Sequence, residues 1–169
     1  MNGRLNKNKK LTSLALTIAF AMILSYVESK VPPLVAIPGI KVGFANIAVI
    51  FTLYKFSAKD AAIVSLLRVL LVSMLFGTGV SLIYSLSGAI LSLTVMILLK
   101  KLTPLREVTV SVCGGVMHNV GQIAAASFML STNVVVYYLP FLVLSGTIAG
   151  IAVGLTAAVM VKKIDLNKI

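Results

Sequence analysis

The sequence predicts an all-α integral membrane protein, a single transmembrane domain over residues 1–169 with six helices and both termini in the cytoplasm. Three observations predict this class. The chain is 59% hydrophobic and 11% charged, whereas soluble domains are about 45–50% apolar and about 25% charged. Its apolar residues form long continuous runs and do not alternate as in β-barrel strands. Twelve of its 15 basic residues form four clusters beside every second boundary of these runs, as in cytoplasmic loops.

The apolar runs define the expected helices, because a membrane span takes about 20 residues, within a range of about 17–25. The predicted spans lie roughly at residues 11–28, 40–54, 60–76, 80–99, 108–130 and 134–161. The basic clusters at their ends can meet anionic lipid headgroups of the bilayer. Because these clusters do not build one basic face, we expect no nucleic-acid partner, and we place the protein in the inner (plasma) membrane.

The first two spans flank an unusual outer loop. The first span resembles a secretory signal but lacks a clear cleavage site, so we expect it to stay uncleaved. Residues 29–41 are apolar for an exposed loop, and three prolines forbid a continuous helix there. We expect this loop to lie on the membrane surface or dip into it, as a lid or a re-entrant segment. The second span is short and is expected to be tilted, broken or partly re-entrant, while Glu28 and Lys30 are interpreted as a solvated rim.

Turn residues mark the boundaries of the remaining spans. Gly77 and Gly79 predict a tight outer turn between the third and fourth spans, and Pro104 predicts the inner turn that follows. Residues 131–133 form the last outer turn. Pro140 falls inside the sixth run, and we expect it either to kink that helix or to mark its true start.

Small residues at helical spacing predict two close helix contacts. Gly146, Gly150 and Gly154 form a ridge on the sixth span, interpreted as intramolecular packing. Ala15 and Ala19 form a similar pair on the first span. We interpret this pair as a candidate docking surface for a partner subunit.

Polar side chains at membrane depth are the candidate substrate-binding residues, since each needs a partner there. Arg68 lies near the middle of the third span and suits a carboxylate or phosphate. His118 and Gln122 share one face of the fifth span, with Asn119 beside them. Asn46 opens the second span, where two roles are open: contact with a bound molecule or capping of the helix. The glycines around the fifth-span group are expected to leave room for a ligand: Gly114, Gly115 and Gly121.

The inventory of acidic residues argues against an enzyme. The chain has four of them, no two close in sequence: Glu28, Asp60, Glu107 and Asp165. Metal-dependent diphosphate chemistry and paired-carboxylate hydrolysis need clustered acids. A metal site is not expected with one histidine and one cysteine, and no nucleotide-binding glycine loop is present. We therefore expect no catalytic residue and no cofactor.

Three segments resemble the Gx transporter family, also labelled heptaprenyl diphosphate synthase component I: residues 38–46 (PGIKVGFAN), 84–89 (YSLSGA) and 114–122 (GGVMHNVGQ). The resemblance extends over nearly the whole chain. That family is similar in topology to the substrate-binding (S) subunits of energy-coupling factor transporters. The similarity implies a six-helix protein that binds a vitamin-like molecule from outside and docks on a transmembrane coupling subunit with an ATPase pair. Ala15 and Ala19 match the Ala-xxx-Ala pair through which such subunits dock.

Three functions of different classes remain open on this sequence. The first is an uptake subunit for a small, partly apolar molecule with an anionic group, bound by Asn46, Arg68, His118, Asn119 and Gln122. The second is a non-catalytic membrane accessory subunit for polyprenyl diphosphate or quinone metabolism. The third is a scaffold subunit of a membrane redox complex, which needs no pocket for a small molecule.

Overall fold

The computed structural model describes residues 7–30 and 43–165, and over these residues it is helical and holds no strand. The elements are α1 (Lys7–Ser29), α2 (Asn46–Lys55), α3 (Ala58–Phe76), α4 (Gly79–Leu102), α5 (Glu107–Leu130), the 3-10 helix η1 (Val134–Tyr138) and α6 (Leu139–Lys163). The predicted all-α class is confirmed. The expected lid or re-entrant loop falls at residues 31–41, outside the described part of the chain.

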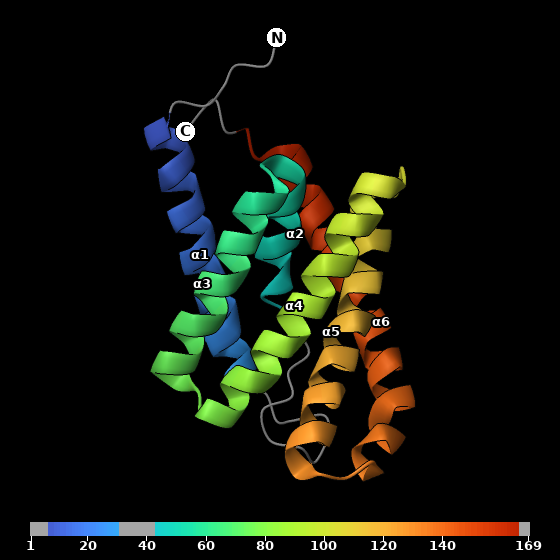
Figure 1. The fold of residues 1–169 in the computed structure, drawn as a ribbon. Coiled ribbons are helices and arrows are strands. Elements are labelled where there is room, and N and C mark those ends of the chain that lie inside the picture. Colours follow the sequence, from blue (N-terminus) through green and yellow to red (C-terminus); the bar gives the residue numbers. More distant parts are fainter. Residues whose placement is uncertain (1–6, 31–42, 166–169) are drawn as a thin grey trace.

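The short helix α2 lies at the centre of the bundle (Figure 1), where it contacts α1, α3, α5 and α6. Every residue from Asn46 to Leu53 is buried, as expected for a helix that is apolar on all sides. Its 10 residues extend about 15 Å, half of the roughly 30 Å hydrocarbon core. The predicted span at residues 40–54 is therefore not a full span within the described residues.

Three helical stretches are long and apolar enough to cross a membrane: α1, α4 and the continuous run Val134–Lys163. Helix α3 carries three charged residues, Lys59, Asp60 and Arg68, which lower its apolar character. The protein is thus a membrane-embedded helical bundle, while the total of six spans stays a prediction. Helix α6 begins at Leu139 with Pro140 in its first turn, where a missing N–H costs no helical bond. Pro140 therefore marks the true start of the helix.

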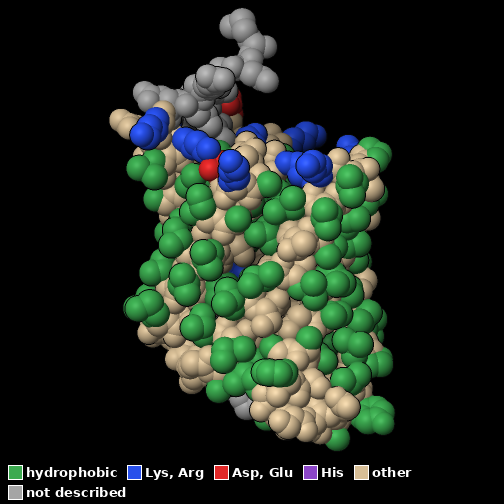
Figure 2. Space-filling view, in the orientation of Figure 1, with side chains coloured by type: hydrophobic (Ala, Val, Ile, Leu, Met, Phe, Trp, Pro, Cys, Tyr) green, Lys and Arg blue, Asp and Glu red, His purple; other side chains and the backbone are tan. Residues whose placement is uncertain are grey.

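Basic side chains gather at one end of the bundle, where α1 begins and α6 ends (Figure 2). Three lysines join helix ends there. Lys10 Nζ lies 2.8 Å from Asp60 Oδ1, Lys55 Nζ donates to Val161 O at 2.9 Å, and Lys100 Nζ donates to Leu53 O. The described residues of the four predicted clusters therefore share one side. That this side is the cytoplasmic one stays a prediction.

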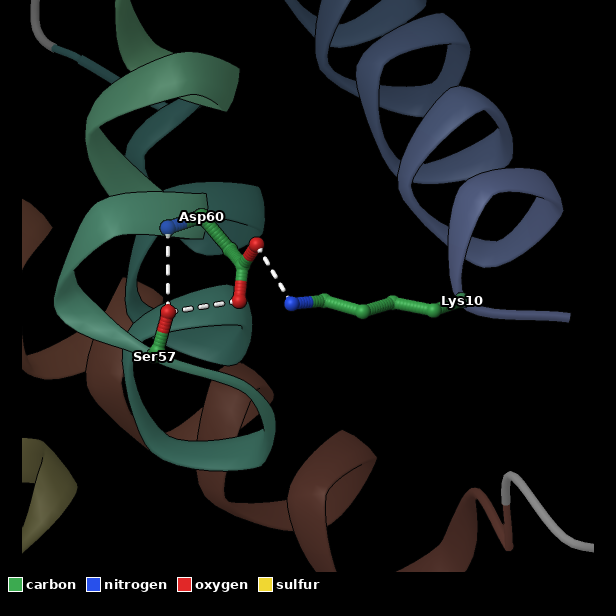
Figure 3. Close-up of polar contacts among 3 residues, drawn as sticks. All are labelled: Lys10, Ser57 and Asp60. Atoms are coloured by element: carbon green, nitrogen blue, oxygen red, sulfur yellow. Dashed lines mark hydrogen bonds and ion pairs between the residues drawn. The ribbon is translucent and has the colours of Figure 1, made fainter. Parts of the chain in front are cut away.

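The contact between α1 and α3 at this end is built on a helix cap (Figure 3). Ser57 precedes α3, and its hydroxyl accepts the Asp60 N–H at 3.2 Å and donates to Asp60 Oδ2 at 2.6 Å. The Asp60 carboxylate sits favourably in the first turn of the helix. It also meets Lys10 of α1, so one carboxylate bonds the Ser57 cap of α3 and ties the two helices together.

Helix α1 turns its polar side inward. Its buried residues are small or polar and recur about once per helical turn: Ser13, Thr17, Ala21, Ser25 and Glu28. Its large apolar residues, such as Leu16 and Ile23, are exposed at 60% and 61%. This inverted arrangement suits a hydrocarbon surrounding, in which burial of an apolar side chain gives no favourable free energy.

Glycines set the close packing of α4, α5 and α6. A Cβ added to Gly150 would lie 2.6 Å from Val112 Cα, and one added to Gly115 would lie 2.6 Å from Gly146 O. The interpretation of the α6 ridge as intramolecular packing is therefore confirmed. The expectation that the α5 glycines leave room for a ligand is wrong, because neighbouring helices fill that room. Added Cβ atoms at Gly114 and Gly121 would lie 2.5 Å from Met96 Sδ and 2.7 Å from Ser87 O.

Replacing Gly150 by alanine should lower the free energy of unfolding by about 1–3 kcal/mol, as overpacking does. The added methyl meets the Val112 backbone, so the clash outweighs the gain of about 1 kcal/mol in helix propensity. Gly79→Ala is the matched control, because nothing lies within 4 Å of its added Cβ. Thermal unfolding of both variants in detergent measures the difference. Equal stability of the two variants would contradict the packing assigned to Gly150.

Candidate functional site

The centre of the candidate site is Arg68, which α3 carries about half-way along its length. Its side chain is buried, with the residue 6% exposed, and its Nη2 donates to Asn46 Oδ1 at 3.4 Å. The Arg68 Nε has no hydrogen-bond partner among the described residues. A guanidinium offers five N–H donors in a rigid fork. Arg68 is thus a buried cation with at least one donor left for another group.

Glu28 is the site residue that sequence reasoning missed. It is 6% exposed, so the expected solvated rim is wrong at this position. Its Oε1 accepts the Gly43 N–H, and its charge lies close enough to act on the Arg68 guanidinium. The signal that could have found it is its spacing: Glu28 continues the inward stripe of small and polar residues on α1.

A glycine turn brings the end of α1 to the start of α2. Gly43 has a φ of +94°, a left-handed conformation that glycine adopts without strain. Its carbonyl accepts the Asn46 N–H at 2.9 Å, and its own N–H bonds Glu28. The Asn46 side chain does not cap α2 and instead accepts from Arg68. The turn therefore holds two acceptors beside the Arg68 guanidinium: the Glu28 carboxylate and the Asn46 amide oxygen.

His118 closes the site from α5. The residue is 3% exposed, and its ring lies against α4, because a Cβ added to Gly88 would be 2.9 Å from His118 Cε1. A cavity of about 20 Å³ separates these groups, enough for one water molecule. Polar side chains from four helices line it: Ser25, Glu28, Arg68, Ser73, Ser85 and His118. The described form is closed, with no room for a larger ligand in this cavity.

The other two predicted site residues lie elsewhere around α5. Asn119 Nδ2 donates to Leu142 O at 2.7 Å, which bonds α5 to α6. Gln122 is 0% exposed and buried in the same helix. The structure thus brings Asn46, Arg68 and His118 together and turns Asn119 toward α6. Ligand binding by any of the five residues stays a prediction.

The chemistry available at the site is binding by charge and hydrogen bonds. Among the residues that the structure describes, no three His, Cys, Asp or Glu side chains group as metal ligands do. The cavity instead pairs one guanidinium and one carboxylate with hydroxyl groups and an imidazole. On the outer face of α1, Ala15 and Ala19 are both exposed, as a docking surface requires.

The fold and the site define a helical membrane protein with a buried polar centre. The chain belongs to the heptaprenyl diphosphate synthase component I family, whose model matches residues 17–160. Neither a curated protein nor a solved structure matches the chain. This match confirms the resemblance of the sequence to that family, while the similarity to S subunits of energy-coupling factor transporters stays a prediction.

The burial of the opposite charges of Glu28 and Arg68 beside one cavity predicts an energetic coupling between them. Glu28→Gln or Arg68→Gln alone should lower the free energy of unfolding by about 3–5 kcal/mol, because each leaves an uncompensated buried charge. The loss of unfolding free energy in the double variant should be smaller than the sum of the two single losses, by about 0.5–3 kcal/mol. A double-mutant cycle of detergent unfolding measures this coupling.

The half-exposed ion pair at the other end of α1 provides the comparison. Lys10 is 42% exposed in its side chain, so Lys10→Gln should cost no more than about 1 kcal/mol. If the loss of unfolding free energy in the double variant equals the sum of the losses in Glu28→Gln and Arg68→Gln, the two charges do not stabilise each other.

Proposed function

We propose that this protein is a membrane-embedded, substrate-binding subunit for the uptake of a small, partly apolar molecule, and that Arg68 binds an anionic group of that molecule. The observation that carries the proposal is a buried guanidinium whose Nε has no partner among the described residues, beside a polar cavity. Arginine binds carboxylates and phosphates through two parallel hydrogen bonds. Asn46 and His118 supply further polar contacts around the same point.

The location of the site supports binding from the outer side of a plasma membrane. Helix α2 runs from Asn46 at the site to Lys55 at the basic end, and Glu28 lies one residue before the end of α1. With the basic end in the cytoplasm, both termini are inside and the site faces outward. Because the cavity holds about 20 Å³, entry of a substrate requires the surrounding helices to separate. Asn119 and Gln122 are proposed contacts of the opened form.

Energy for uptake would come from partners, since the chain has no nucleotide-binding loop. The exposed pair Ala15 and Ala19 on α1 supports docking on a transmembrane coupling subunit that carries an ATPase pair. Small residues on a lipid-facing helix let another helix approach closely. On this proposal the protein resembles the S subunits of energy-coupling factor transporters, and it is not itself an enzyme.

A second candidate function is favoured by the family description, which names a component of heptaprenyl diphosphate synthase. On this proposal the protein is a non-catalytic membrane subunit that presents a lipid substrate to a soluble synthase. It predicts binding of that synthase at the basic end, independent of Arg68. Co-sedimentation of the soluble synthase with vesicles that contain the protein separates the two functions.

Substitution of Arg68 tests the binding role. In the Arg68→Gln variant the affinity for an anionic small molecule should fall about tenfold or more, the loss of one charged hydrogen bond. Native mass spectrometry of protein extracted in mild detergent should show a bound molecule on the wild type and none on this variant. Arg106→Gln, which removes an exposed arginine, is the matched control and should retain the molecule. Retention by Arg68→Gln would contradict the site.

Substitution on the outer face of α1 tests the docking role. Ala19→Trp should abolish co-purification of the ATPase subunits without lowering the unfolding temperature, because the side chain points away from the bundle. Ala152→Trp places the same bulk on an exposed position of α6 and should leave the complex intact. Loss of the complex in both variants, or in neither, would argue against a docking surface on α1.

A further inference from the structure

A groove on α5 lies at the end of the bundle opposite the basic side chains, beside the turn between α5 and η1 (Figure 1). It has a volume of about 680 Å³, within the range of about 300–1,000 Å³ that is usual for small-molecule sites. Val120, Ala124 and Phe128 line it from α5, and Val136 lines it from η1. The described residues that line this groove are different from those around the Arg68 cavity.

The groove lies on the lipid-facing side of α5. The neighbouring sides of this helix are occupied, because a Cβ added to Gly121 would lie 2.7 Å from Ser87 O of α4 and Asn119 bonds α6. On the groove side, Phe128 is 87% exposed and Ala124 is also exposed. In a membrane-embedded bundle such a surface is in contact with the bilayer. Lipid molecules therefore have direct access to the groove.

The polarity of the groove changes along its length. The stretch of α5 from Val120 to its end at Leu130 extends about 15 Å, half of the roughly 30 Å hydrocarbon core. The groove thus spans about one leaflet. Most of its lining is apolar, whereas four polar side chains gather at the last turn of α5 and in the loop that follows: Ser127, Ser131, Thr132 and Asn133. This profile matches an amphiphile with its head at the membrane surface and its chain toward the bilayer centre.

Hydrogen bonds define the polar end of the groove. Ser127 Oγ lies 2.9 Å from Thr132 O and 3.2 Å from Asn133 Oδ1, and its hydrogen can bond either oxygen. Ser131 ends α5 with a φ of 49°. Both Ser131 and Asn133 are exposed, so a hydroxyl and an amide are accessible to a headgroup. Together they offer donors as well as acceptors.

The absence of charge along the groove restricts the kind of headgroup. Of the lining residues that the structure describes, none is charged. Phosphate groups are typically bound by Arg or Lys, whereas hydroxyl and carbonyl groups need only uncharged donors and acceptors. Contacts with the chain select little, because lipid tails are as apolar as leucine. The polar end must therefore provide the selectivity, and it suits an uncharged head.

We propose that this groove binds a neutral lipid of the leaflet opposite the basic end. The uncharged hydroxyl or carbonyl head of the lipid lies at Ser131 and Asn133, and its chain lies along Val120, Ala124 and Phe128. This inference goes beyond the proposed function, because it adds a second site that does not depend on Arg68.

Native mass spectrometry of the full chain in mild detergent tests the proposal. The probe is a diacylglycerol, whose head is a single hydroxyl. The wild type should bind one molecule, and Ala124→Phe, which fills the groove, should weaken this binding about tenfold or more. Ala152→Phe adds the same bulk on an exposed position of α6 and should leave the binding unchanged. Equal binding by the two variants overturns the inference.

A second probe tests the selection of an uncharged head. Phosphatidic acid with the same two chains adds only a phosphate group, and it can bind the lysines at the opposite end of the bundle. Its binding should therefore be the same in the wild type and in Ala124→Phe. A loss of phosphatidic acid as large as the loss of diacylglycerol would show that the groove does not select a neutral head, and would overturn the inference.

A change at the polar end tests the contact with the head. Asn133→Ala should weaken the binding of diacylglycerol about fivefold, the loss of one hydrogen bond between uncharged groups. Unchanged binding in this variant would contradict the assigned position of the head. The same spectra report the oligomeric state. A wild-type dimer that Ala124→Phe dissociates would show that a second copy covers the groove, and would overturn the proposal of a lipid.

Discussion

The burial of two opposite charges, Arg68 and Glu28, beside one cavity is the constraint on which the arrangement of the surrounding helices depends. An arginine at the centre of a membrane helix costs about 2.5–3.5 kcal/mol on insertion scales, and Arg68 is buried inside the bundle. Its cost is lowered by an anion and a neutral acceptor from two other elements, Glu28 and Asn46. The Gly43 turn, with its positive φ, places both acceptors. The inward polar stripe of α1 follows from the same need, because Glu28 must face the bundle.

A short central helix creates a second need, because α2 starts inside the bundle and ends at the basic side, where it packs against α4 and α6. Unsatisfied carbonyls and N–H groups there cost several kcal/mol each in the absence of water. At the start of α2, the Gly43 carbonyl accepts the Asn46 N–H. At its end, the ammonium of Lys100 bonds the Leu53 carbonyl. Lys55 extends this bonding to the end of α6. The basic residues that predict the membrane orientation therefore also satisfy helix ends, which a count of charges does not reveal.

Composition and run length predicted the helical membrane class because they depend on total apolar surface, which a hydrocarbon solvent requires. Arg68 was predicted as a buried group since a charge inside an apolar run has few alternatives. Glu28 was missed because a residue near a helix end looks the same in sequence whether it faces water or the interior. His118 and Asn119 were grouped together, yet neighbours on a helix point about 100° apart. One therefore faces α4 and the other bonds α6.

Helix α1 joins the site to the proposed docking surface. Its fully buried face is made of small and polar side chains, and the partly buried Leu14, Ile18 and Leu24 pack beside that face. Polar contacts add to this packing at the two ends of the helix, Lys10 with Asp60 and Glu28 with Gly43. The same helix carries Ala15 and Ala19 on its exposed face, so the proposed binding site and the proposed docking surface share one helix. Any coupling between them must be reciprocal: a partner that favours one placement of α1 changes the affinity for the ligand by the same factor.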